Sequence, residues 1–490
     1  MKTRISTACR IAFALLLAYS NTGFALGLSP REAWLRQDLQ ALTDTQHLQS
    51  LTSTWPIPWP QLKHALAEVN VATLPPYLVA AHSRLTHHLE QQTATLRLRT
   101  TVRGSSTPPL TTTFGPYHTE IASISTGIGF TANRTSGQLH LRATHDRSDP
   151  QTAQFDDSFF LQRLGNWGIG VDTVDRWWGP AWRSSLILSH NTRPIPTIFL
   201  NRQSLDPFDQ AWLHWLGPWR LMTFMGRLES SRHIPNALLW GARFTFSPHP
   251  RWEVGLSRTA TWAGDGRPAN FDAFTDLLLG HDNFELDDPD KINEPGNQLA
   301  GIDLRYAQPI GNASVAMYTQ VIGEDEAGNL PSRPILLLGA SITLPGAFAP
   351  LSTIIEYQDT ALDAYRDSIF NSAYNHSIYQ SGYRYRGRSI GSSYDNDTRA
   401  LSWGALFSLS TRWQCSLWLS HINGNRDGLA GGNPVFQTKL ETAHAQITAR
   451  YHMKQHQLTL ASDWWEKLPN NRLARSERAG LRIDYTWQWE

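Results

Sequence analysis

The stretch Leu96-Arg97-Leu98-Arg99-Thr100-Thr101-Val102-Arg103 places three arginines on one of two alternating rows and mostly apolar residues on the other. A period of two is typical of a β-strand whose faces meet different surroundings. The arginine row cannot face lipid, because an arginine near the middle of a bilayer costs about 2–4 kcal/mol. We therefore predict that the arginines face the lumen of a barrel or the N-terminal part of the chain.

The same alternation recurs along the rest of the chain. Examples are 124–130, 238–246, 252–256, 302–306, 315–321, 401–409 and 447–451. The last segment, Leu481–Trp489, alternates in the same way and resembles the aromatic-rich strand by which outer-membrane barrels are recognised for assembly, so we expect the barrel assembly machinery as a partner. Together these segments predict a mainly β fold, a large closed antiparallel barrel over residues 93–490.

Composition agrees with a membrane barrel. Charged residues make up 17% of the chain and aromatic residues 11%, yet the mean hydropathy is −0.37, so apolar residues are interleaved with polar ones. A barrel segment of about 400 residues, at roughly 20–25 per strand and connection, gives on the order of 16 to 20 strands. Such a barrel encloses an aqueous lumen. The most apolar later stretch, 335–355, alternates and contains two prolines, which favours a strand and a turn over a helix.

The first 25 residues have the pattern of a secretory signal peptide. Basic residues precede an apolar core at 11–18, and Gly23-Phe24-Ala25 offers small residues for cleavage. The alternative, a transmembrane helix, needs about 20 apolar residues, more than this core has. Cleavage removes three basic residues and no acidic one and changes the formal net charge from +1 to −2. Nucleic acid is therefore not an expected partner.

Residues 26–92 have helical periodicity. Ser29-Pro30-Arg31-Glu32 has the pattern of a capping box with proline at the first helical position. Two more helices are predicted, over about 60–70 and 76–91, and three short helices suggest a small antiparallel bundle. The proline-rich segment Thr54–Pro60 fits either a peptide ligand or a structural clamp against the bundle or the barrel mouth, and we favour the clamp.

Connections between the predicted strands are of two kinds. Ser247–Pro250 and Gln308–Asn312 are short and suit periplasmic turns, whereas 262–298, 357–398 and 423–437 are long and suit the outer side. Loops held by a rigid scaffold usually carry recognition. We therefore expect the ligand at the long loops.

Motifs for catalysis or metal binding are weak. The acidic segment His281–Asp290 lacks EF-hand spacing and is better explained as a solvated loop than as a calcium site. Glu324-Asp325-Glu326 is better explained as a turn than as a pair of catalytic carboxylates. After signal cleavage Cys415 is the only cysteine, so no disulfide or cysteine metal site is expected. We predict no enzyme activity, cofactor or metal; a hydrolase with catalytic groups at the barrel rim is an alternative.

The segment Asp175-Arg176-Trp177-Trp178-Gly179-Pro180-Ala181-Trp182 has two interpretations. Its aromatic rings can stack on sugar rings while Arg176 bonds hydroxyl or acidic groups. Alternatively it plugs the lumen, with Arg176 packed on indoles by cation–π contacts, and we favour this plug. Arg176, Trp177, Trp178, Trp182 and Trp262 are nevertheless the candidate polysaccharide-binding residues.

The order of these motifs resembles the Wzi family of outer-membrane capsule-assembly proteins. The resemblance rests on 54–59, 175–182, 216–219, 226–230, 255–259, 295–301 and 322–328. It implies a barrel of about 18 strands in the bacterial outer membrane, closed on the periplasmic side by the helical bundle of residues 26–92. It also implies a lectin-like role, in which a monomer holds capsular or related exopolysaccharide at the cell surface.

A diffusion porin of the outer membrane, general or sugar-selective, is the competing function. A porin needs an open lumen, usually with a constriction of charged residues. The helical segment before the barrel favours a closed lumen instead.

Overall fold

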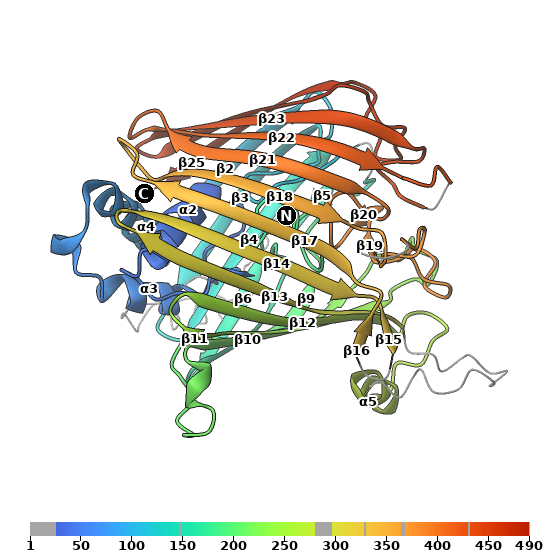
Figure 1. Ribbon diagram of the computed structural model, residues 1–490, viewed down its shortest axis with the longest axis horizontal. Coiled ribbons are helices and arrows are strands. Elements are labelled where there is room, and N and C mark those ends of the chain that lie inside the picture. The colour runs from blue at the N-terminus through green and yellow to red at the C-terminus, as the bar shows by residue number, and fades with distance from the viewer. Residues whose placement is uncertain are drawn as a thin grey trace, which may run out of the picture.

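Strands that close into one antiparallel barrel form the wall of the protein (Figure 1). The computed structural model describes residues 26–146, 149–279, 296–327, 330–363, 368–429 and 432–489, so the predicted signal peptide lies outside the described residues. Within them the wall has eighteen strands, the number that the resemblance implied. They are β2 (Leu96–Ser105), β3 (Ala122–Thr131), β4 (Thr135–His145), β6 (Phe159–Leu164), β7 (Trp167–Asp172), β9 (Thr197–Arg202), β10 (Trp219–Arg227), β11 (Leu238–His249), β12 (Trp252–Trp262), β13 (Asn297–Ile310), β14 (Ala313–Gly323), β17 (Ile335–Leu344), β18 (Leu351–Asp359), β21 (Arg399–Ser408), β22 (Trp413–Gly424), β23 (Leu440–Met453), β24 (His456–Trp465) and β25 (Ala479–Trp489). The two-residue β5 (Ala153–Gln154) is counted with β6 here, because both pair with β4.

Strand β2 has the two faces that its sequence predicts. It closes the barrel by pairing with β25, Leu98 opposite Trp489, and with β3 on its other side. Leu96 and Val102 are 64% and 48% exposed on the outer face, whereas the arginine row lines a cavity inside the barrel. The prediction from the arginine row is therefore confirmed.

The two ends of the barrel differ in their connections. At one end, which we call the head end, most turns are short, including those at 132–134, 165–166, 250–251, 311–312 and 454–455. At the opposite, loop end, the connections 106–121, 173–196, 263–296 and 360–398 are long. The predicted short turns near 250 and 310 lie at the head end, and the three predicted long loops lie at the loop end.

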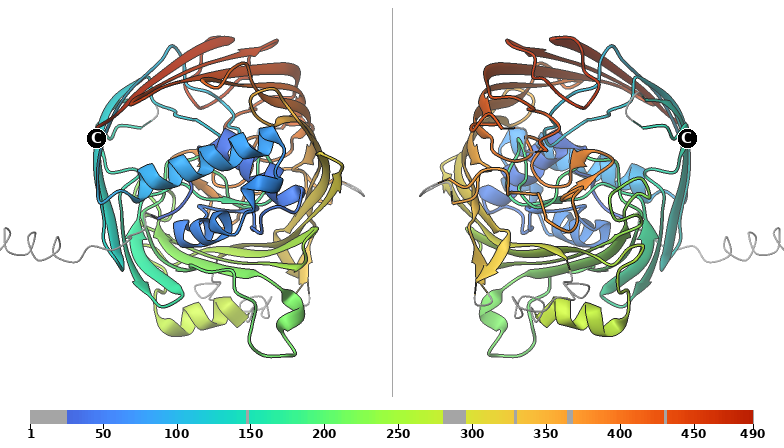
Figure 2. Two further views of the ribbon diagram at one scale, coloured as in Figure 1. Left: turned by 90° about the vertical axis from the view of Figure 1, so that its left-hand side faces the viewer. Right: turned by 90° about the vertical axis from the view of Figure 1, so that its right-hand side faces the viewer.

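The N-terminal helices lie at the head end and reach into the lumen (Figure 2). They are α2 (Ala33–Asp44), α3 (Trp59–Ala67), the 3-10 turn η1 (Val71–Thr73) and α4 (Pro76–Thr93). Helix α2 is buried almost all round, polar Gln37 and Asp38 included. Gln37 donates to Leu406 O at 2.9 Å, so the helix is fixed to the barrel wall.

The capping box predicted at residues 29–32 is wrong. Helix α2 begins later, at Ala33, with Glu32 as a cap residue that makes no side-chain capping bond. The Glu32 carboxylate instead accepts from Arg450 Nη1 of β23 at 2.6 Å. An ion pair with the wall thus replaces the local bond that the sequence pattern suggested.

A small sheet inside the lumen joins the N-terminal segment to the loop end. Strand β1 (Thr54–Trp55) pairs antiparallel with β8 (Trp177–Trp178). The Trp55 ring packs edge-on against Phe114, with centroids 4.9 Å apart. The proline-rich segment is therefore a structural clamp, as favoured from the sequence. What we call the plug consists of this sheet, the preceding residues Thr52 and Ser53, and loops 106–121, 173–196 and 368–398.

Helix α5 (Phe271–Leu279) lies against the outside of the wall near the loop end (Figure 2). Its Phe274 ring packs on Trp262, with centroids 5.1 Å apart. Arg258, on the outer face of β12, donates to the carbonyls of Leu278 and Leu277 at 2.9 and 2.8 Å. The carbonyl groups at the end of α5 thus cover the charged guanidinium of Arg258, which lies on the otherwise apolar outer face of β12. None of the helices in the described ranges is long and apolar enough to cross a membrane.

Candidate functional site

The five candidate sugar-binding residues are buried. Their exposed fractions are 6% for Arg176, 0% for Trp177 and Trp178, 2% for Trp182 and 6% for Trp262. The first four lie in the plug, whereas Trp262 lies at the end of β12 beneath α5. The structure therefore does not bring all five together, and the favoured plug interpretation describes the first four. Their contact with sugar stays a prediction.

Cation–π contacts stabilise the plug, but the arginine that lies over one of its indoles is Arg36 and not the predicted Arg176. Arg176 pairs with Asp172 at 2.8 Å and lies over the Phe224 ring, 4.9 Å from its centroid, not over an indole as predicted. Arg36 of α2 lies over Trp182, 4.1 Å from the ring centroid, and donates to Ala181 O at 2.8 Å. Burial lowers the pKa of Arg36 to about 9. The sequence pattern did not indicate this role of Arg36, because its partners Pro180 and Ala181 are 144 and 145 residues away along the chain.

Two carboxylates of the wall hold the plug by its main chain. Glu356 of β18 accepts from the backbone N–H groups of Trp182 and Arg183 at 2.6 and 2.8 Å. Glu253 of β12 accepts from the backbone N–H groups of Thr52 and Ser53 at 2.9 and 2.8 Å. Charged acceptors make such bonds stronger than neutral ones. Neither residue stood out in the sequence, since each is a single acid on a strand.

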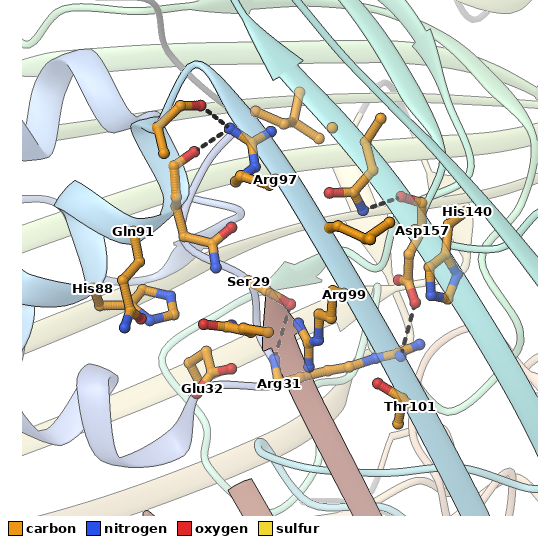
Figure 3. Close-up of a pocket in the computed structure, with 18 of the residues that line it drawn as sticks. Ser29, Arg31, Glu32, His88, Gln91, Arg97, Arg99, Thr101, His140 and Asp157 are labelled. Carbon is orange, nitrogen blue, oxygen red and sulfur yellow. Dashed lines mark hydrogen bonds and ion pairs between the residues drawn. The ribbon is translucent and has the colours of Figure 1, made fainter. Parts of the chain in front are cut away.

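A cavity lies between α4 and the wall strands β2, β3 and β4 (Figure 3). Its volume is about 550 Å³, and an adjoining cavity of about 310 Å³ shares Glu32, His88 and Arg99 with it. We call the larger cavity the arginine chamber. Its polar lining includes Ser29, Arg31, Glu32, His88, Gln91, Arg97, Arg99, Thr101, Arg103, Gln138, His140, Asp157, Asp175 and Gln488.

Two glycines on the inner face of β3 make room in the chamber. A Cβ atom at Gly129 would lie 2.7 Å from Nη2 of Arg97, and one at Gly127 would lie 2.7 Å from Cδ2 of His140. Both separations are well below van der Waals contact. The glycines therefore let the Arg97 and His140 side chains lie against the wall.

The acids of the chamber are paired with arginines. Arg31 pairs with Asp175 at 2.5 Å and with Asp157 at 3.2 Å. Burial opposes ionisation of Glu32, but Arg450 and other cations outweigh it and lower the pKa of Glu32 to about 2. For Asp175 burial is the larger effect and raises the pKa to about 6 despite Arg31. Glu32 is thus held as an anion, and Asp175 is the acid most easily neutralised.

His88 predicts a pH dependence of stability. Burial, aided by Arg99 and Arg450 and opposed by Glu32, lowers its pKa from 6.5 to about 4. The unfolded chain then binds the proton more tightly, so this contribution to stability is lost as the pH falls from about 6.5 towards 4. The thermal unfolding midpoint of the wild-type protein should therefore fall between pH 7 and pH 5. We expect this fall to be smaller for His88→Gln, which has no imidazole to protonate. His64→Gln, at an exposed histidine on α3, is the control, and an equal drop in all three proteins would contradict the assignment.

The weak metal and carboxylate motifs gain no support. His281–Asp290 lies outside the described residues, and Asp325 begins a hairpin strand, β15 (Asp325–Ala327), paired with β16 (Leu330–Ser332). Across the described ranges no group of three or more His, Cys, Asp or Glu side chains is placed to hold a metal ion.

Comparisons with known proteins point to one family. A family model described as capsule assembly protein Wzi matches residues 92–479. An uncharacterized 55.8 kDa protein in the cps region of Klebsiella pneumoniae is 30% identical over 335 residues. That match covers 67% of this chain and 64% of the relative, slightly less than two thirds of the relative's length.

One solved structure has the same fold over nearly its whole length. It is Wzi of Escherichia coli, with a TM-score of 0.82 and 24% sequence identity, and the match covers 94% of this chain and 99% of that one. That protein is described as an outer membrane protein involved in group 1 capsule assembly and as a carbohydrate-binding β-barrel. The fold of the present chain is therefore that of an experimentally known barrel.

Proposed function

Since the chain belongs to the Wzi family of capsule assembly proteins, we propose that it is an outer-membrane lectin that holds exported capsular or related polysaccharide at the cell surface. The Escherichia coli protein of the same fold is described as carbohydrate-binding, which supports this role. The relative from Klebsiella pneumoniae is described by its place in the cps region, in agreement with capsule assembly.

The plug is the observation that carries the proposal. Buried aromatic residues from both ends of the barrel form one core inside it, including Trp55, Trp177, Trp178 and Tyr374, all below 1% exposed. A diffusion pore needs continuous water through the lumen, whereas a binding protein needs only a rigid frame for its loops. The closed interior therefore favours binding over the porin alternative.

The barrel is an outer-membrane protein, and its wall fits a bilayer. Large apolar side chains such as Ile124, Ile302 and Ile447 are 55%, 46% and 51% exposed on the outer face. In outer-membrane barrels the short turns face the periplasm and the long loops face outwards. On this rule the head end is periplasmic and the loop end is the cell surface.

The long loops are the surface that we assign to the polysaccharide. The four buried plug residues 176, 177, 178 and 182 would then support these loops from beneath. We further propose that the protein is a monomer without enzymatic activity. The closing strand β25 would serve recognition by the barrel assembly machinery.

Deletion of the gene tests this function. We expect the strain to make its exopolysaccharide in normal amount but to release it into the medium, because the holding protein is absent. Microscopy of surface polysaccharide and an assay of the medium measure the two quantities, and a plasmid copy should restore retention. Unchanged retention in the deletion strain would contradict the proposal.

A further inference from the structure

We propose that the arginine chamber binds the carboxylate groups of an acidic oligosaccharide that enters from the head end. The inference rests on the proposed function for its orientation, which makes this end periplasmic. It adds a second, inner site to a protein whose polysaccharide contact is assigned to the opposite end.

The chamber contains positive charge that its own acids do not compensate. Each buried acid of the chamber is already engaged: Glu32 with Arg450 at 2.6 Å, and Asp157 and Asp175 with Arg31. Glu90, at the rim, is exposed. Arg97 and Arg99 therefore face the chamber without a carboxylate within 4.0 Å among the described residues.

Arg97 and Arg99 also have hydrogen-bonding capacity that the described residues do not use. Arg97 donates only through Nη1, to Gln92 O, Ala94 O and Thr131 Oγ1, and its Nε and Nη2 have no acceptor in the described part of the chain. Arg99 Nε likewise has none there. A guanidinium presents its N–H groups as a planar fork that matches the two oxygens of a carboxylate. These three nitrogens are buried, those of Arg97 against Gly129, so an acidic ligand would bond them once the arginine side chains turn into the chamber.

The size and lining of the chamber fit a short oligosaccharide. A cavity of about 550 Å³ lies within the range of roughly 300–1,000 Å³ that small-ligand sites occupy. Thr101 and Gln488 add neutral polar groups that can bond sugar hydroxyls. The chamber thus combines two cations with uncharged hydrogen-bonding groups, as an acidic sugar requires.

Access is from the head end. Three residues that line the chamber lie at that end: Gln92 in the last turn of α4, and Ala94 and Lys454 in connections. On the other side, Asp157, Val174 and Asp175 of the loop-end connections close it. Ligand would therefore come from the periplasm, as a uronate-bearing exopolysaccharide or as the carboxylate-bearing glycan of the cell wall.

Calorimetry with the purified, detergent-solubilised full-length protein tests the proposal. The probes are trigalacturonate, a carboxylate-bearing muropeptide and neutral maltotriose. We expect at least one acidic probe to bind and maltotriose not to bind. Arg99→Gln and Arg97→Gln should each weaken acidic-probe binding about tenfold or more, the loss expected for a charge-assisted bond. The affinity of Arg99→Lys for the acidic probe should lie between those of the wild type and Arg99→Gln, because lysine keeps the charge but not the planar fork.

Arg412→Gln is the matched control, because Arg412 is an exposed arginine at a head-end turn outside the chamber lining. Heat-modifiable migration in gels checks that each variant is folded. Equal binding of maltotriose, no binding of either acidic probe, or unchanged binding by both glutamine variants would overturn the inference. Which acidic probe binds more tightly identifies the source of the ligand.

The outcome is separable from that for the proposed function. Cells that carry Arg99→Gln and still retain exopolysaccharide, while the purified variant loses the acidic probe, support an inner site distinct from the surface site. Normal retention of exopolysaccharide by the deletion strain, together with tight acidic-probe binding by the wild-type protein, would contradict the lectin role. It would leave the inner site supported.

Discussion

Replacing Asp303 by alanine is expected to destabilise the folded barrel by about 3–5 kcal/mol, the usual cost of leaving one member of a buried ion pair alone. Asp303 of β13 accepts from both terminal nitrogens of Arg243 of β11, at 2.6 and 2.9 Å. The two side chains are 2% and 0% exposed. Arg243 also donates to Thr54 Oγ1 at 2.7 Å and to Ser53 Oγ at 2.9 Å. The pair therefore joins two strands of the wall to the plug.

Urea unfolding of the protein in detergent measures this effect. Glu68→Ala is the control, because Glu68 and its partner His64 are 66% and 74% exposed and exposed pairs contribute little. The double variant Arg243→Met/Asp303→Ala should regain part of the loss, since it leaves no unpaired buried charge. Similar losses for Asp303→Ala and Glu68→Ala would contradict this account.

The wall was predictable because its signal is local. Long strands such as β3, β11 and β14 repeat the two-residue alternation, and the arginine row of β2 alone excluded lipid on one side. The same row indicated where the chamber lies, since Arg97 and Arg99 had to face the lumen or the head. What the row did not reveal is that these arginines lack carboxylate partners within the part of the chain that the structure describes, because the acids nearby come from other segments.

The plug was predictable in kind but not in its contacts. The aromatic residues at 177, 178 and 182 indicated a packed lumen, yet the cation over Trp182 is Arg36, from a helix whose start was placed too early. Glu253 and Glu356 hold backbone N–H groups about 200 and 174 residues away along the chain. Such contacts depend on closure of the whole barrel and leave no pattern within a window of sequence.

Closure of the lumen should depend on the two wall carboxylates that hold the plug. We expect the wild-type protein to show no steady openings in a planar bilayer and the double variant Glu253→Ala/Glu356→Ala to open frequently. Each carboxylate accepts from two backbone N–H groups, and each charged bond contributes about 1.5–3 kcal/mol. Their loss leaves buried N–H groups unsatisfied inside the plug, and these groups can bond water only if the plug moves.

The conductance measurement distinguishes three cases: a plug that the two carboxylates hold in place, an open pore, and a plug that its other contacts hold in place. Glu441→Ala is the control, because Glu441 pairs with His421 at an exposed position, with side chains 66% and 62% exposed, and does not contact the plug. Steady large openings of the wild type would favour the porin, since they require water through the lumen. Absence of openings in the double variant would mean that the other plug contacts suffice, namely the aromatic packing around Trp55 and Trp177 and the bonds that arginines such as Arg36 donate to the plug.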